Sequence, residues 1–336
     1  MKNKNWIKIA SIYIGTVIGA GFASGREIVD FFGAYGVKGI WGIIISGILF
    51  SLLGSLLLIK IHDSKIEDFN GLVNKLFGKG FGFIIDTIIS FSLYTGFSIM
   101  ISGSGAIFKE ELGLPFDIGV LIMASLSFIV FLFSLKGLSF VNTLLVPLLI
   151  IGIIFTSFYL NIREGFVFSH SQGVDFTGKG NFITSSLLYF GSNCLIIIVV
   201  FSSLLPLIDD RGTAIIGGSV GGFILAILAL SIFTSMLIYY NEVFNLEIPM
   251  LRICDHIGEG YRKLYAIILW IAMFTTALAN GFGFMDKINK NKLLNTAFFC
   301  ISAIPLAKVG FANLVGIIYP ISGIIGFVMM VIILLH

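Results

Sequence analysis

Apolar runs long enough to cross a membrane recur along the whole chain, and this repetition constrains the fold more than any other feature. About 20 apolar residues in a helix cover the roughly 30 Å of hydrocarbon in a bilayer. The sequence contains ten such runs, at approximately 6–31, 39–61, 82–107, 115–136, 140–162, 182–207, 213–240, 261–285, 293–308 and 312–335. Backbone groups must be paired within hydrocarbon, so runs of this kind are expected to be helical. The sequence therefore predicts an all-α integral membrane protein with ten spans.

Composition agrees with this class of protein and argues against others. Of the 336 residues, 57% are hydrophobic and 12% are charged, and the mean hydropathy is +1.04. A soluble domain of this size does not have such a composition. The net charge of +3 is spread over the predicted loops without a basic tail, so we expect no nucleic-acid partner. The loops show no soluble domain, and we expect residues 1–336 to form a single membrane domain.

Basic residues suggest how the chain is oriented. With the N-terminus inside, the cytoplasmic segments carry a modest excess of Lys and Arg, and the N-terminal segment contributes Lys2, Lys4 and Lys8. The first apolar run is followed by charge and a second span without a cleavage-site pattern, so we do not expect a removed signal peptide. Both termini are predicted to be cytoplasmic.

Glycine and charge interrupt the first apolar run. Residues 15–25 have the sequence Gly-Thr-Val-Ile-Gly-Ala-Gly-Phe-Ala-Ser-Gly and lead directly into Arg26, Glu27 and Asp30. Glycine is a poor helix residue and charge next to hydrocarbon is costly, so this helix is expected to be broken. Backbone left unpaired at a break is tolerated only where protein or a water-filled site covers it. We interpret the break as half of a binding site.

Ten spans divide into two halves of five, and an odd number of spans gives the halves opposite orientations. This is the plan of an inverted repeat, here 6–163 followed by 182–335. The plan predicts a second break in the sixth run, where Gly191, Ser192 and Asn193 interrupt apolar residues. Close helix packing through small residues is the alternative explanation of this stretch.

The eighth run places oxygen atoms on one face of a helix. Ala272 and Thr276 are one turn apart and Thr275 lies beside them, so one carbonyl and two hydroxyls can converge next to the helix. Sodium requires hard oxygen ligands, and carbonyls of an unwound neighbouring helix could complete its shell. Threonine hydroxyls that bond to their own helix explain the pattern equally well.

The run Gly15–Gly21, together with Ala272-x-x-Thr275-Thr276, resembles the sodium site of LeuT-fold transporters of the amino acid/polyamine/cation superfamily. The pattern of ten spans with breaks in the first and sixth covers nearly the whole chain, and within the superfamily it is most similar to the bacterial amino acid permease group. The resemblance implies a symporter in a prokaryotic inner membrane that moves a small amino acid or related solute with Na+ by alternating access. The sodium ligands that it implies are the carbonyls of Gly15 and Ile18 and the eighth-run oxygens of Ala272, Thr275 and Thr276.

The resemblance also implies moving parts. Gly137 and Pro147 are separated by nine residues at the fifth run, and related symporters use this arrangement to unwind the helix and open an inward water path. Proline removes a backbone donor and weakens a helix locally. This pair is therefore the predicted break on the inner path.

An outer gate is expected after the first break. Related transporters pair an Arg at this place with an acid in the tenth helix, but the tenth run has no Asp or Glu. Arg26 is therefore expected to pair with Glu27 or Asp30, or to meet the substrate. Tyr319 in the tenth run is predicted to lie near the same gate.

The substrate pocket is expected between the two breaks. The half-helix that begins near Ala23 points its amide ends inward, which suits a carboxylate. The third run has a polar stripe at four-residue spacing, and Tyr94 is placed against the substrate by analogy with relatives; a buried tyrosine bonded to a carbonyl is the alternative. The predicted substrate residues are Gly19, Gly21, Phe22, Ala23, Ser24, Gly25, Tyr94, Ser98, Phe190, Gly191, Ser192 and Asn193.

Other functions fit the sequence less well. An intramembrane enzyme needs a nucleophile, an acid–base pair or a metal cluster within the spans, and all four histidines lie in predicted loops or at a terminus. A proton-coupled or sodium-independent exchanger or exporter is the main alternative; such proteins often carry a Lys in the fifth run, and 140–162 has none. An ion channel is less favoured, because no filter repeat or ring of charge is visible. The expected partners are a small-molecule substrate and the lipid bilayer, without an obligate protein partner.

Overall fold

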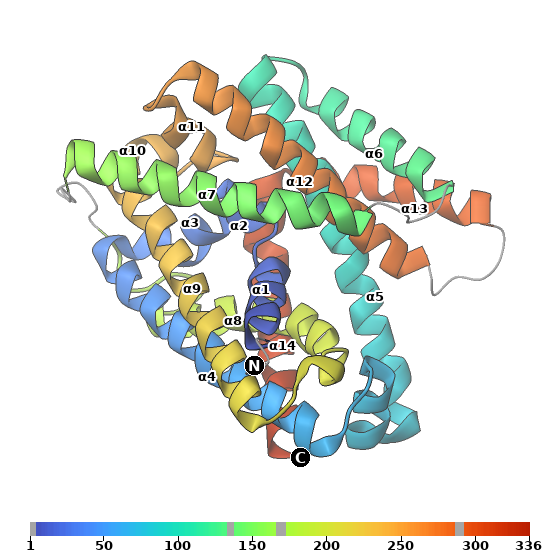
Figure 1. Cartoon of the computed structure of the whole chain (residues 1–336). Coiled ribbons are helices and arrows are strands. Elements are labelled where there is room, and N and C mark those ends of the chain that lie inside the picture. Colours follow the sequence, from blue (N-terminus) through green and yellow to red (C-terminus); the bar gives the residue numbers. More distant parts are fainter. Residues whose placement is uncertain (1–4, 133–137, 166–172, 286–291) are drawn as a thin grey trace.

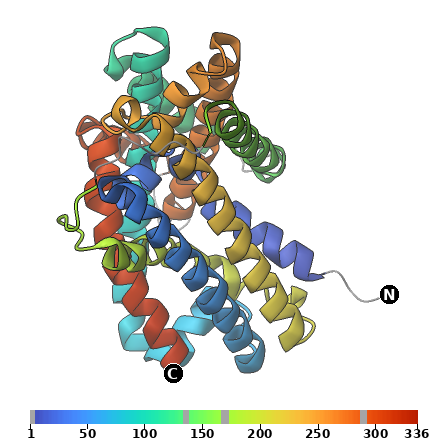
Figure 2. The same ribbon diagram turned by 90° about the vertical axis from the view of Figure 1, so that its left-hand side faces the viewer.

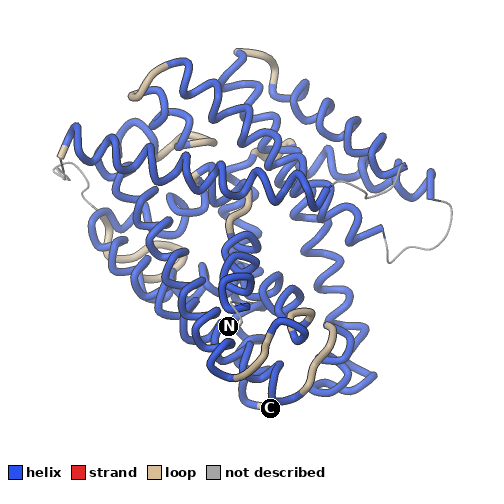
Figure 3. The backbone as a smooth tube through the Cα atoms, in the orientation of Figure 1, coloured by secondary structure: helices blue, strands red, loops and turns tan. Residues whose placement is uncertain are grey.

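The computed structural model describes residues 5–132, 138–165, 173–285 and 292–336. All regular secondary structure in these four segments is helical, with one isolated bridge between Thr177 and Gly180 (Figure 3). Within these segments, seven helical stretches are long and apolar enough to cross a membrane, and α6 and α13 are shorter apolar helices. The predictions of an all-α fold and of a multi-pass membrane protein are confirmed, and the count of ten spans stays a prediction.

Most of the elements follow one another along the chain with short connections, and the connection between α7 and α8 is longer. In order they are α1 (Asn5–Val17), α2 (Ala20–Ser24), α3 (Arg26–Phe32), η1 (Gly33–Lys38), α4 (Gly39–Ser64), α5 (Phe69–Leu112), α6 (Phe116–Leu132), α7 (Leu138–Glu164), α8 (Phe182–Ser202), η2 (Leu205–Leu207), α9 (Arg211–Ile238), α10 (Tyr240–Val243), α11 (Pro249–Asp255), α12 (Glu259–Met285), α13 (Lys292–Ala307) and α14 (Phe311–Leu335).

Long helices surround the connection between α1 and α2 near the centre of the molecule (Figure 1). Helix α4 packs along α9, α8 along α14, and α5 along α12. The view in Figure 2 shows α4, α9 and α14 as long rods on one side of the bundle. The break in the first span is therefore enclosed by helices from both halves of the sequence.

The predicted break in the first run is confirmed. Helix α1 ends at Val17 and α2 begins at Ala20, and the Gly19 backbone between them is extended, with φ −95° and ψ −178°. A second interruption follows at Gly25, whose φ of 78° lies in the left-handed region that favours glycine. The span thus consists of two helices joined by a five-residue helix.

The predicted break in the sixth run is wrong, because α8 is continuous from Phe182 to Ser202. Gly191 serves helix packing instead: a Cβ added there would lie 2.1 Å from the carbonyl oxygen of Gly323 in α14. The side chains of Ser192 and Asn193 donate to the Tyr189 carbonyl of the same helix, at 2.8 and 3.1 Å. The small-residue explanation therefore accounts for this stretch.

The predicted break in the fifth run is also wrong at Pro147, which lies inside a continuous α7. Gly137 lies outside the described residues. Proline removes one N–H, but the other backbone groups of an apolar segment stay paired in a helix because hydrocarbon offers them no partner.

Candidate functional site

A cavity of about 150 Å³ opens at the break in the first span. Its walls come from both sides of the break and from α5, α8, α12 and α14. Among the described residues its polar lining consists of Thr16, Glu27, Ser92, Thr95, Ser192, Asn193, Thr276, Asn280, Tyr319 and Ser322. Such a concave site with a few convergent polar groups is the usual form of a small-molecule site.

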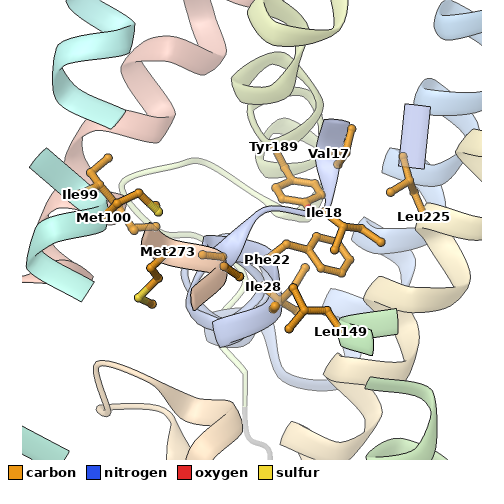
Figure 4. Packing of buried hydrophobic residues seen from close by; sticks show 14 of the residues in the cluster. Val17, Ile18, Phe22, Ile28, Ile99, Met100, Leu149, Tyr189, Leu225 and Met273 are labelled. Atoms are coloured by element: carbon orange, nitrogen blue, oxygen red, sulfur yellow. The ribbon is translucent and has the colours of Figure 1, made fainter. Parts of the chain in front are cut away.

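Apolar side chains pack around the same connection and fix its path. Figure 4 shows Ile99, Met100 and Met273 on one side of it and Phe22 and Leu149 on the other. All five side chains are at least 97% buried. The extended backbone between α1 and α2 is therefore covered by protein, as a break at membrane depth requires.

Glu27 brings a carboxyl group into the cavity wall. Its side chain is 5% exposed and hydrogen-bonds with the Tyr319 hydroxyl. A Cβ added to Gly21 would lie 2.0 Å from Glu27 Oε1 and 3.2 Å from Tyr319 Oη. Glycine at position 21 thus leaves the space that the carboxyl group occupies. Tyr319, which was predicted near the gate, lines the cavity.

The eighth-run oxygens lie next to the cavity. Thr276 lines it, and the hydroxyls of Thr275 and Thr276 both donate to the Ala272 carbonyl, at 3.0 and 2.8 Å. The carbonyl and the two hydroxyls therefore converge as the spacing predicts, and the hydrogen bonds are those of threonines that bond to their own helix. Gly19, next to Ile18 in the connection between α1 and α2, lines the same cavity as Thr276. The sodium ligand set, with Gly15 and Ile18, stays a prediction.

The predicted substrate residues separate into two groups. Gly19, Gly21, Ser192 and Asn193 line the cavity. The others are outside its described lining: Phe22, Ala23, Ser24, Gly25, Tyr94, Ser98, Phe190 and Gly191.

Internal contacts explain the positions of several residues in the second group. Tyr94 packs against Phe284 and Phe299, with ring centroids 6.2 and 5.7 Å apart. Ser98 Oγ donates to the Tyr94 carbonyl at 3.0 Å, and Ser24 Oγ donates to the Gly21 carbonyl at 2.7 Å. The two serine hydroxyls are bonded within their own helices, and the Tyr94 ring is packed against neighbouring rings.

Sequence reasoning missed the polar face that α5 presents to the cavity. Ser92, Thr95, Gly96 and Ile99 line it, at the i, i+3, i+4, i+7 spacing of one helix face. Asn280 of α12 was also missed; it fits because a Cβ on Gly96 would lie 2.7 Å from Asn280 Nδ2. A glycine opposite a long amide is visible only once the two helices are placed side by side.

Arg26 points away from the cavity lining. Its guanidinium pairs with Asp30 at 3.1 Å and donates to the carbonyls of Phe244 and Leu246, at 3.1 and 2.8 Å. Asp30, one of the partners that the sequence suggested, also meets Lys179 Nζ at 3.7 Å. Burial lowers the pKa of Lys179 while the charge of Asp30 opposes the shift. Helix α3 is thereby tied to two loops, 173–181 and 244–248.

Removal of the shared acid should loosen this connection. Asp30→Asn leaves two largely buried cations without their anion, and we expect the free energy of unfolding to fall by about 3 kcal/mol. Thermal unfolding in detergent measures the change. Asp175→Asn is the matched control: its partner Lys38 is exposed, and an exposed pair contributes less than about 1 kcal/mol. Equal losses in the two variants would show that the Asp30 cluster does not hold α3.

Solved structures of other proteins show which class of fold this chain has. No family model matches the chain. Its fold is similar to that of the manganese transporter of Eremococcus coleocola, with a TM-score of 0.65 and 15% identity over 100% of this chain and 80% of that one. The fold is that of a polytopic membrane protein and is similar to that of a known transporter.

Two relatives in Bacillus subtilis (strain 168) are similar over almost their full length. The uncharacterized membrane protein YkvI is 32% identical over 327 residues, which cover 94% of this chain and 91% of YkvI. The uncharacterized protein YyaD is 25% identical over 331 residues, which cover 97% and 95% of the two chains. The chain belongs to the family of YkvI.

Proposed function

We propose that the protein is a sodium-coupled symporter of a small amino acid or related solute that works by alternating access, with the ten-span inverted repeat of the LeuT fold. The observation that carries the proposal is the break in the first span, which opens into a cavity lined by several polar side chains from different helices. Transporter sites are typically built from discontinuous helices near the middle of the membrane. The similarity of fold to a metal-ion transporter supports transport as the general activity.

Thr276 connects the two proposed sites. It belongs to the sodium ligand set and also lines the cavity. In this proposal sodium between the α1–α2 connection and α12 fixes the wall against which the substrate binds. Coupling then requires that sodium and substrate favour the same conformational state. A ligand that binds both states with equal affinity does not shift the equilibrium between them.

The ion pairs at Arg26 supply the proposed outer closure. With both termini in the cytoplasm of a prokaryotic cell, loops 173–181 and 244–248 are external. The contacts of Arg26 and Lys179 with Asp30 and with the Phe244 and Leu246 carbonyls then close the route from the outside to the cavity. Substrate entry requires that these contacts separate.

Uptake into liposomes tests the proposed function. We expect saturable uptake of an amino acid driven by an inward sodium gradient, and little uptake with potassium in its place. Uptake driven by a proton gradient alone would identify the alternative, a proton-coupled carrier. Single-channel currents without saturable uptake would contradict the transporter proposal.

A further inference from the structure

We infer that the cavity recognises a protonated amine and that the Glu27 carboxylate is its counter-ion, so that the substrates are small solutes that carry an ammonium group. This inference deepens the proposed function and rests on it. It concerns which end of the substrate the protein binds by charge. The sequence alone suggested the opposite end, because the amides of a half-helix suit a carboxylate.

The charge of the cavity wall is the first argument. Among the described lining residues Glu27 is the one charged side chain; the other polar groups are hydroxyls and amides. Arg26 is adjacent in sequence, but its guanidinium is bound to Asp30 and to the carbonyls of Phe244 and Leu246. Glu27 can therefore contribute only a negative charge to the cavity, and a bound cation beside it favours its ionised form. A ligand with only a carboxylate would be repelled there, whereas a cation would be attracted.

The position of the carboxyl group is the second argument. Glu27 Oε1 lies where a Cβ of residue 21 would be, against the first turn of α2. The protein's own carboxyl group thus occupies the place that the sequence suggested for a substrate carboxylate. Tyr319 gives this group one hydrogen bond, and a carboxylate can accept about four. Acceptor capacity is left for the N–H groups of an ammonium.

The size and lining of the cavity define the rest of the ligand. A volume of about 150 Å³ holds roughly ten water-sized groups, which corresponds to a solute of about ten non-hydrogen atoms. Asn193, Asn280 and Thr276 offer neutral donors and acceptors. These uncharged side chains can hydrogen-bond to a carboxylate, an amide or a hydroxyl at the other end of the solute.

A panel of matched ligands tests the inference on the unmodified protein. Each set contains an amino acid, the amine that remains without its carboxyl group, and the acid that remains without its amino group, for example L-alanine, ethylamine and propionate. The measurement is the shift of the unfolding temperature with ligand concentration, in sodium-containing detergent solution. We expect stabilisation by the amine-bearing members and none by the acids. Stabilisation by the acids that equals that by the amines would overturn the inference.

Variants at Glu27 test the residue. Glu27→Gln keeps the shape and removes the charge, and we expect the affinity for amine ligands to fall by about 30-fold or more. Glu27→Asp keeps the charge and should retain part of the affinity for amine ligands. Glu67→Gln, which removes an exposed acid outside the cavity, should leave the affinity unchanged. Unchanged amine affinity in Glu27→Gln would overturn the assignment, and the ligand panel on the unmodified protein decides the substrate class if that variant does not fold.

The outcomes separate this inference from the function on which it rests. Sodium-driven uptake without a preference for amines would leave the transporter proposal standing and overturn the inference. Stabilisation by Mn²⁺ that depends on Glu27, without stabilisation by amines, would assign the carboxylate to a metal ion and overturn it as well. Amine-selective stabilisation without sodium-driven uptake would support the inference and contradict the symport proposal.

Discussion

Sodium should lose its effect when Thr275 and Thr276 are both replaced by alanine. The predicted site takes one carbonyl and two hydroxyls from α12, so the double variant removes two of the ligands at once. In the unmodified protein, sodium at 100 times its Kd would stabilise the folded state by about 2.7 kcal/mol. We expect this stabilisation, and sodium-dependent uptake, to disappear.

The same double variant should fold, because both hydroxyls donate to the Ala272 carbonyl of their own helix. Such bonds add little to the stability of a membrane helix. Thr87→Ala is the matched control, since Thr87 makes the same kind of bond to Phe83 on the exposed side of α5. Sodium dependence that survives in the double variant would remove these residues from the ligand set.

The folded state should lose about 3 kcal/mol or more when Gly191 is replaced by alanine. The added Cβ would lie 2.1 Å from the Gly323 carbonyl oxygen, which is backbone and cannot turn aside. Helices α8 and α14 must then move apart, and overpacking of this kind is costly. The midpoint of thermal unfolding in detergent gives the measurement.

Gly260→Ala provides the comparison for that variant. Gly260 lies in the first turn of α12, and a Cβ there meets no atom within 4 Å among the described residues. Alanine is the better helix residue, so we expect this change to be neutral or to add up to about 1 kcal/mol of stability. Similar unfolding temperatures for the two variants would show that α8 and α14 do not depend on the glycine contact.

The break in the first run could be predicted from the sequence, whereas the continuous helix at the sixth run could not, for a physical reason. Glycine allows a chain to leave a helix, and it also allows two helices to approach closely. At Gly19 the charged residues that follow favoured the first use, and the structure agrees. At Gly191 the choice depends on Gly323, which is 132 positions away in sequence and adjacent only in the fold. Spacing along one chain segment does not contain that information.

The lining of the site shows the same limit. A long membrane helix has polar residues on more than one face. The sequence prediction named Tyr94 and Ser98, whereas Ser92 and Thr95 line the cavity. Which face meets the cavity is set by how α5 rotates against α12. The partner of Arg26 was easier to predict, because Asp30 is four residues away on the same helix. Side chains at this spacing are neighbours in any helix, whatever the rest of the fold.

Helix α2 is bounded by an extended residue at Gly19 and a left-handed one at Gly25. This five-residue helix connects α1 to α3, and the backbone is non-helical at both of its ends. The angle between α1 and α2 can change at Gly19 without changing the angle between α2 and α3 at Gly25. If the direction of the first span changes during the proposed transport cycle, we expect the change to occur at Gly19 and Gly25.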